Sequence, residues 1–191
     1  MNPIKKLRSS KVLTRLRRDQ NGAILTELAL SVPIFLTLLT GVVETGNYML
    51  MNLKLQHTVV SIADLVTRDE TVSEDVIADI FEAVPQILKP FPTGDRARTI
   101  ISSISQTEDV VASVFWQRSG GGDFDAASTL GQEGDAVTLP AGLTLRDNET
   151  ILATEVFYRY EPLVFSFIEA KTIRKVSYFR PRIGALQEIE P

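Results

Sequence analysis

The residue types that most often do chemistry are scarce in this 191-residue sequence. Cysteine is absent, which excludes disulfides, thiol catalysis and cysteine-ligated zinc or iron–sulfur sites. His57 is the only histidine, and no motif brings it together with a serine and an aspartate. We therefore expect no catalytic residues, no metal centre and no cofactor, and we interpret His57 as a surface or packing residue.

The stretch 119–148 has little periodicity and holds the other candidates for a ligand site. Its Gly120–Gly122 run lacks the Gly-Lys-Ser/Thr sequence of a phosphate-binding loop, so we do not expect a nucleotide site. Asp123, Asp125 and Asp135 could contribute to a calcium site, but their spacing matches no known calcium loop. An exposed, solvated acidic loop is the simpler interpretation.

Two carboxylates, Glu27 and Glu44, stand in apolar surroundings near the N-terminus. Residues 28–43 between them carry no charge, and the apolar run extends from Ala23 to Leu53. A membrane-spanning helix needs about 20 predominantly apolar residues, so this run can cross a membrane once. A carboxylate at the bilayer centre costs at least about 2.5 kcal/mol, so we expect each glutamate near one interface. For Glu44, flanking the span is a sufficient explanation.

The charge distribution predicts how the chain is oriented across that membrane. Residues 1–22 carry a net charge of +6, whereas the whole chain carries −4, which leaves −10 for the remainder. A basic head before an apolar span predicts a cytoplasmic N-terminus, with the acidic C-terminal part on the other side. This arrangement fits membrane lipid as a partner and gives no support for nucleic acid.

The periodicities predict an α+β fold with a long N-terminal helix. We expect one helix over 23–68, with its transmembrane half at about 28–50. Thr71-Val-Ser-Glu74 reads as a capping box, which predicts a second helix over 72–88 that Pro85 can interrupt. We expect residues 69–191 to form an extracytoplasmic α+β domain, with the irregular stretch 119–148 as a loop within it.

Four strand-like runs follow the second helix, and they predict a small antiparallel sheet with the long helix against one face. The runs are 98–105, 110–118, 151–161 and 172–180. In the second run, period-2 alternation would place Val110, Ala112, Val114 and Trp116 on one face. In the third, Leu152, Val156, Tyr158 and Tyr160 would share a face, and Trp116 is expected in the core or against the helix.

Four sequence pieces occur in order along the chain. The first is Arg18-Asp-Gln-Asn-Gly22 followed by Glu27 and Pro33, and the second is the Gly-x-x-Glu-x-Gly run formed by Gly41, Glu44 and Gly46. The third and fourth are Tyr158-Arg-Tyr-Glu-Pro162-Leu163 and Tyr178-Phe-Arg180-Pro181-Arg182 near the C-terminus. Together these pieces resemble TadE-like proteins, the minor pilins or pseudopilins of tight-adherence (Tad, type IVc) pili.

This resemblance implies how the N-terminal region is processed and used. A prepilin peptidase would cut between Gly22 and Ala23 and remove the leader 1–22. Glu27 would then be the fifth residue of the mature chain, where its carboxylate can pair with a neighbouring subunit's new amino group and specify register. Pro33 would fall inside the helix and favour a kink or local melting.

The leading functional interpretation is a structural one: a minor pilin or pseudopilin acting in assembly, priming or tip formation of a Tad-type pilus. The implied partners are the prepilin peptidase, other minor and major Tad pilins and the inner-membrane assembly platform. The alternative is an uncleaved, single-span accessory or binding protein. A type II secretion pseudopilin is a third interpretation, against which the Gly-x-x-Glu-x-Gly and Arg-Pro-Arg pieces argue.

Overall fold

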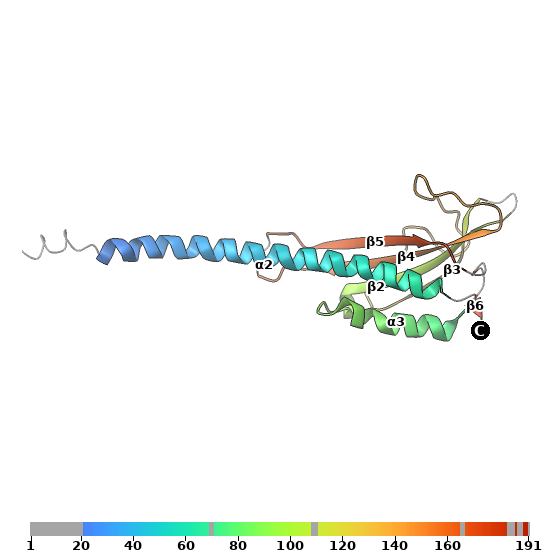
Figure 1. Ribbon diagram of the computed structural model, residues 1–191, viewed down its shortest axis with the longest axis horizontal. Coiled ribbons are helices and arrows are strands. Elements are labelled where there is room, and N and C mark those ends of the chain that lie inside the picture. The colour runs from blue at the N-terminus through green and yellow to red at the C-terminus, as the bar shows by residue number, and fades with distance from the viewer. Residues whose placement is uncertain are drawn as a thin grey trace, which may run out of the picture.

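The fold is an α+β arrangement in which a long helix carries a four-stranded sheet at one end (Figure 1). The computed structural model describes residues 21–68, 71–107, 111–164, 167–182, 186 and 189–190. Of the expected leader, residues 1–20 lie outside the described residues. The fold class predicted from the sequence is confirmed.

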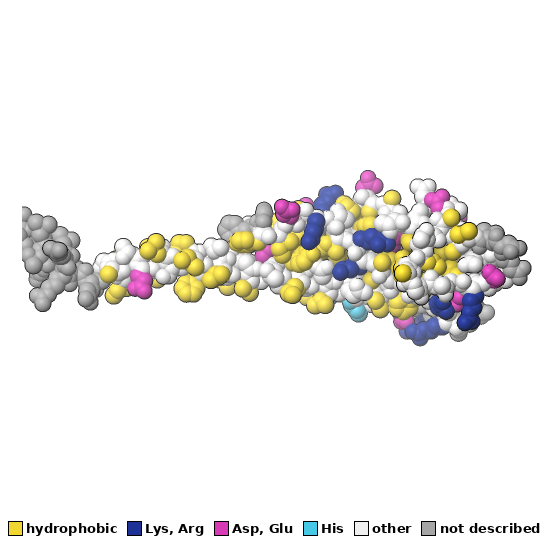
Figure 2. All heavy atoms as spheres, turned by 90° about the horizontal axis from the view of Figure 1, so that it is seen from above, with side chains coloured by type: hydrophobic (Ala, Val, Ile, Leu, Met, Phe, Trp, Pro, Cys, Tyr) yellow, Lys and Arg dark blue, Asp and Glu magenta, His cyan; other side chains and the backbone are white. Residues whose placement is uncertain are grey.

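Helix α2 spans Asn21–Val66, 46 residues, and matches the predicted long helix closely. Large apolar side chains are exposed along its first half, and yellow side chains cover much of the narrow part of the molecule on the face that Figure 2 shows. Its second half is amphipathic, with buried residues at spacings of three and four. That buried stripe consists of Met51, Leu55, Val59, Ile62 and Val66. One continuous helix thus serves two environments.

The first half of α2 qualifies as a membrane span by length and composition. Pro33 lies inside the helix, as expected, and the helix is continuous through it. The kink or local melting predicted at this residue stays a prediction. The hydroxyls in this half bond back to carbonyls four residues earlier, which satisfies them inside the helix, as Ser31 to Glu27 and Thr37 to Pro33 illustrate.

Helix α3 spans Glu74–Leu88 and packs beside α2. The predicted capping box was displaced by two residues: Ser73, and not Thr71, is the N-cap, and its Oγ accepts the Val76 N–H at 3.4 Å. The reason is that Val72–Ser73 forms the short strand β1, which pairs in parallel with β6 (Ile189–Glu190). Pro85 lies within α3 without interrupting it.

The main sheet is antiparallel with strand order β3-β2-β4-β5, which confirms the predicted four-stranded sheet. The longest strands, β2 and β4, lie at its centre. A single 3₁₀ turn, η1 (Gly94–Arg96), leads into β2. The strands are β2 (Ala97–Gln106), β3 (Ser113–Gly120), β4 (Glu149–Tyr160) and β5 (Lys171–Phe179).

A bulge in β3 overturns the predicted face of one strand. Ser103 pairs with Trp116, but the next residue, Ile104, pairs with Val114, which leaves Phe115 as the extra residue. Trp116 therefore packs in the core beneath the helices, whereas Val114 packs in a separate cluster with Ile104. The expectation that Val114 and Trp116 share a face is wrong, because a bulge shifts the alternation of side chains by one.

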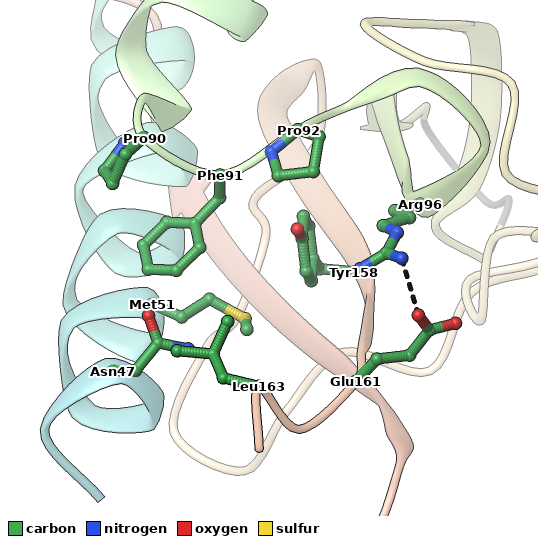
Figure 3. A pocket seen from close by; sticks show the side chains of 9 residues that line it. All are labelled: Asn47, Met51, Pro90, Phe91, Pro92, Arg96, Tyr158, Glu161 and Leu163. Atoms are coloured by element: carbon green, nitrogen blue, oxygen red, sulfur yellow. Dashed lines mark hydrogen bonds and ion pairs between the residues drawn. The ribbon is translucent and has the colours of Figure 1, made fainter. Parts of the chain in front are cut away.

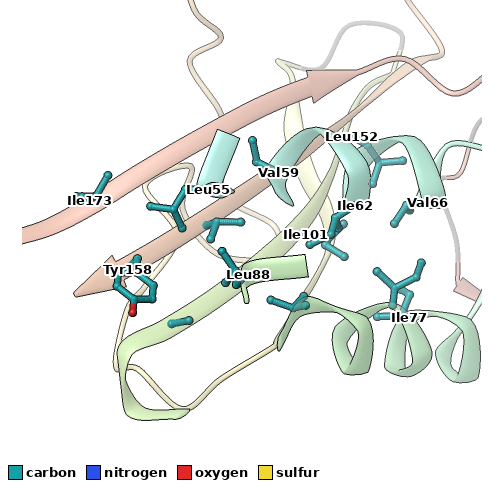
Figure 4. Close-up of a cluster of buried hydrophobic side chains, with 14 of the residues drawn as sticks. Leu55, Val59, Ile62, Val66, Ile77, Leu88, Ile101, Leu152, Tyr158 and Ile173 are labelled. Atoms are coloured by element: carbon teal, nitrogen blue, oxygen red, sulfur yellow. The ribbon is translucent and has the colours of Figure 1, made fainter. Parts of the chain in front are cut away.

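The principal core lies between the sheet and the two helices (Figure 4). Residues from α2, α3, β2 and β4 meet there, including Leu55, Leu88, Ile101 and Leu152. The predicted shared face of β4 is confirmed, since all four of its residues belong to this cluster. Trp116 is also buried there, and its Nε1 donates to the Leu186 carbonyl at 3.0 Å.

The opposite face of the sheet is covered by the stretch after β3, which the sequence suggested would be exposed. Leu130, Val137 and Leu145 are buried against Ile104 and Ile151. This stretch is therefore a third layer with apolar anchors spaced too irregularly to give a periodic signal. Within it, Gly120–Gly122 lie close to Phe81, Val84 and the Ala97 carbonyl, which explains the run of glycines.

Candidate functional site

Gly22 and Ala23 lie in the first turn of α2, and both are exposed. The position where a Gly22 side chain would begin meets no atom within 4 Å. Glu27 follows one and a half turns later and is also exposed. Among the described residues, no group bonds to the Glu27 carboxylate. The predicted processing site and the first carboxylate are thus on an open helical segment.

Glu44 has the opposite environment, because its side chain is 1% exposed and its carboxylate is fully bonded inside the chain. Oε1 accepts the Tyr160 hydroxyl, and Oε2 accepts the Leu163 N–H at 3.0 Å and the Val164 N–H at 3.4 Å. Successive backbone N–H groups form a small anion-binding concavity. Glu44 therefore fastens α2 to the connection after β4, and the interpretation that it only flanks the span is incomplete.

This contact brings together two of the four motif pieces that the sequence separates widely. Glu44 belongs to the Gly-x-x-Glu-x-Gly run, while Tyr160, Pro162 and Leu163 belong to the run after β4. Pro162 has no N–H, so the first donors after it are those of Leu163 and Val164, and both bond to Glu44. Burial and the bond to the Glu44 carboxylate raise the pKa of Tyr160 above its ordinary value.

The Arg-Pro-Arg piece secures the other end of the same helix–sheet packing. Arg182 Nη2 lies 2.5 Å from Asp64 Oδ1 near the end of α2, and its N–H donates to the Thr67 carbonyl. Arg180 lies 2.9 Å from Glu149 at the start of β4. Glu44 and Asp64 are separated by about 30 Å along the helix at 1.5 Å per residue. The motif pieces thus hold α2 at both ends of the domain.

Gly41 and Gly46, which flank Glu44, make no close contact inside the chain. A Cβ built on either residue meets no atom within 4 Å. Glycine inside a helix costs about 1 kcal/mol relative to alanine, so an intramolecular reason for these glycines would require a close neighbour. The described residues provide none.

A second buried carboxylate, Glu155 on β4, was missed by sequence reasoning. It is 0% exposed and accepts bonds from Ser128, from Thr129 Oγ1 at 2.8 Å and from Arg174 Nε at 2.7 Å. Its partners lie on the stretch after β3 and on β5, so it fastens the third layer to the sheet. A glutamate at an inward position of an otherwise apolar strand was the available signal.

The pocket drawn in Figure 3 lies beside the Glu44 contact and has a volume of about 260 Å³. Met51, Phe91 and Leu163 supply apolar walls. At its edge Arg96 and Glu161 form an ion pair of 2.5 Å, so each of these charges has its partner. The lining is mainly apolar, and the residues that form it include no nucleophile with an adjacent base.

The remaining candidates do not assemble into a ligand site. Among the residues that the structure describes, no three histidine or acidic side chains gather as metal ligands. Asp135 Oδ2 instead accepts the Gln132 N–H at 2.7 Å. His57 is exposed on α2, 3.5 Å from the Ser61 hydroxyl, as expected of a surface residue.

The geometry defines a class of protein: a single N-terminal membrane-type helix fastened along its second half to a small antiparallel sheet domain. Residues 22–63 match a family described as TadE-like protein, so the chain is TadE-like over this region. The predicted resemblance is confirmed over that range, which lies entirely within α2. Searches of curated proteins and of solved structures gave no significant match.

The family match and the apolar helix together support three general conclusions. A TadE-like region indicates a protein associated with a Tad pilus, and that family is structural and pilin-like, not enzymatic. The single apolar helix indicates single-pass anchoring in a membrane. Association with other components of the pilus follows from the family as well.

Proposed function

We propose that this protein is a minor pilin or pseudopilin of a Tad-type pilus, acting in its assembly, priming or tip formation. It is inserted in the inner membrane with its N-terminus in the cytoplasm and its sheet domain in the periplasm. A prepilin peptidase removes the leader between Gly22 and Ala23. The mature helix then packs with the helices of other minor and major pilins at the assembly platform.

The observation that carries this proposal is the contrast between the two carboxylates of the apolar stretch. The Glu44 carboxylate accepts hydrogen bonds from three donors within its own chain, whereas the Glu27 carboxylate has no bonding partner among the described residues. An uncompensated carboxylate near a membrane interface is costly, and polar groups at such depth are retained for a functional partner. Glu27 is therefore available for an intermolecular contact.

Cleavage after Gly22 creates a suitable partner. It gives Ala23 a free α-amino group, a cation, on a helix of the same kind in each subunit. The exposed apolar half of α2 offers the surface on which such helices pack, and Gly41 and Gly46 allow close approach because nothing in this chain covers them. A Glu27–amine pair would then fix the axial register between neighbouring helices.

The cleavage step is tested by replacing Gly22 with a larger residue. Gly22→Leu, coexpressed with the cognate peptidase, should retain the leader, because the peptidase cleaves after glycine, and intact-mass analysis should give a chain beginning at Met1. Gly41→Leu is the matched control, since it is also a helical glycine with open space around it, and it should be processed normally. A Gly22→Leu chain that still begins at Ala23 would show the cleavage site to be wrong.

The pairing role of Glu27 is tested separately from cleavage. Glu27→Gln keeps the shape and removes the charge, so it should leave processing and the sheet domain unchanged while reducing pilus assembly and co-purification of other pilins. Glu44→Gln is the comparison, because it should weaken the attachment of the domain instead. Normal pili and normal co-purification in Glu27→Gln would remove the pairing role. Native protein that always retains Met1 would favour the uncleaved anchor.

A further inference from the structure

Among the described residues of the connection between β4 and β5, three large apolar side chains are exposed. Leu163, Val164 and Phe167 are 61%, 60% and 53% exposed. This connection forms the end of the sheet domain nearest to the exposed apolar half of α2 (Figure 1). An exposed apolar cluster on a small domain marks a contact with another apolar phase or partner. The position of the cluster beside the apolar half of α2 indicates that this apolar phase is the membrane.

The Glu44 contact sets the depth of this cluster relative to a membrane. If the charge-free segment 28–43 is centred in the bilayer, Glu44 lies about 13 Å from the midplane at 1.5 Å per residue. The hydrocarbon core extends about 15 Å on each side of that plane. The Leu163 and Val164 amides bond to the Glu44 carboxylate at 3.0 and 3.4 Å, so they share its depth. The backbone of Leu163 and Val164 is therefore at the hydrocarbon boundary.

The neighbouring side chains are those that favour a membrane–water interface. Tyr48 and Tyr160 pack edge to face with ring centroids 5.1 Å apart, and Lys171 Nζ lies 4.8 Å from the centroid of Tyr48. Tyr160 is fully buried, so Tyr48 is the ring that can reach the headgroups, where tyrosine rings concentrate, and Lys171 can extend its ammonium group toward them. The acid at the start of the connection, Glu161, is already paired with Arg96. This environment matches lipid headgroups better than open water.

We propose that Leu163, Val164 and Phe167 insert into the interface of the same bilayer that α2 spans, so that the sheet domain rests on the lipid. Glu44 holds Leu163 and Val164 at this depth by accepting their backbone N–H groups, and the exposed surfaces of the three side chains face the acyl region. The partner is the lipid leaflet facing the domain. This inference requires α2 to span the membrane, but it does not depend on leader removal or on pilus assembly.

The absence of cysteine in the sequence allows a direct test by single-cysteine labelling. Leu163→Cys and Phe167→Cys are each labelled with an environment-sensitive fluorophore in the full chain, in nanodiscs of phosphatidylethanolamine and phosphatidylglycerol. Val111→Cys is the matched control, because Val111 is 69% exposed and lies beyond the opposite ends of the strands. A blue shift and quenching by acyl-chain nitroxide lipids are expected at 163 and 167 and not at 111.

Two outcomes would overturn the proposal. Labels at 163 and 167 that behave like the label at 111 would show that the connection stays in water. A blue shift that appears only in discs holding two chains, without quenching by nitroxide lipids, would assign the cluster to a second copy. Trp116 fluorescence in every variant confirms that the sheet domain is folded, since this tryptophan is buried in its core. The substituted side chains are exposed, so the fold should be retained.

Discussion

The Glu44–Tyr160 contact predicts a large and specific coupling between the membrane helix and the sheet. Tyr160 is fully buried, so Tyr160→Phe removes one donor from a buried carboxylate without opening a cavity. A hydrogen bond to a charged group contributes about 1.5–3 kcal/mol. For a protein of this size 1 kcal/mol changes Tm by roughly 2–4 °C, so a loss of about 2 kcal/mol should lower Tm by roughly 4–8 °C.

Glu44→Gln tests the same contact from the other side. Its amide keeps one acceptor oxygen but turns an NH₂ group toward donors, so the expected loss is at least as large as for Tyr160→Phe. Because both changes remove one shared bond, the double variant should lose about 1–2 kcal/mol less than the sum of the single losses. Thermal unfolding of the full chain in detergent, followed by Trp116 fluorescence, provides all three values.

The control for this cycle is Tyr158→Phe, which removes a hydroxyl from the same face of β4. Tyr158 is buried in the same core but does not bond to Glu44, so its effect should add to that of Glu44→Gln. If the Glu44–Tyr160 coupling is below about 0.5 kcal/mol, the range of simple additivity, the contact does not join the helix to the sheet. Equal coupling of Tyr158→Phe and Tyr160→Phe with Glu44→Gln would also refute a specific Glu44–Tyr160 contact.

Two further predictions concern the sheet domain. Burial raises the pKa of Tyr158 and Tyr160 above the ordinary 10.0, so the folded protein keeps protons that the unfolded chain loses. This contribution to stability is complete below pH 10 and is lost as pH rises toward the folded pKa, so Tm should fall above pH 10. The part of the tyrosinate absorbance that comes from Tyr158 and Tyr160, identified with the Tyr158→Phe and Tyr160→Phe variants, should appear only on unfolding. Gly121→Ala places a Cβ 2.9 Å from Val84 at φ +72°, and should cost about 2–3 kcal/mol in chemical unfolding. Gly134→Ala, at φ +92° with open space around it, should cost only the backbone strain of about 1–2 kcal/mol, and equal losses would exclude the packing clash.

The elements of this fold follow from local sequence, but the contacts that join them do not. The long apolar run predicts α2, and the alternation of apolar residues predicts the shared face of β4. Both predictions succeed because each signal comes from residues that are close together in the sequence. Glu44 resisted interpretation because its partner Tyr160 is 116 residues away. In isolation the glutamate looks the same whether it borders a membrane or bonds to a strand.

Two smaller errors also have non-local causes. Only Thr71 has the glutamate three residues later that a capping box requires, but Val72 and Ser73 pair with the distant β6, so the helix begins after Ser73. The bulge that separates Val114 from Trp116 depends on how β3 pairs with β2, which no pattern in β3 alone reveals. The role of Glu155 is likewise not visible in β4 alone, because its partners Thr129 and Arg174 come from other parts of the chain.

The continuity of α2 has a mechanical consequence. The helix runs from Asn21 to Val66 as one rod of about 69 Å, and the domain is fixed to it at Glu44 and again at Asp64. The domain therefore has little freedom to swivel about the rod. Moving the helix by one residue past a neighbour combines an axial step of about 1.5 Å with a turn of about 100°. A change of register between neighbouring helices in the membrane would thus also rotate the sheet domain about the helix axis. The axial position of the domain and the direction in which it faces are therefore set together.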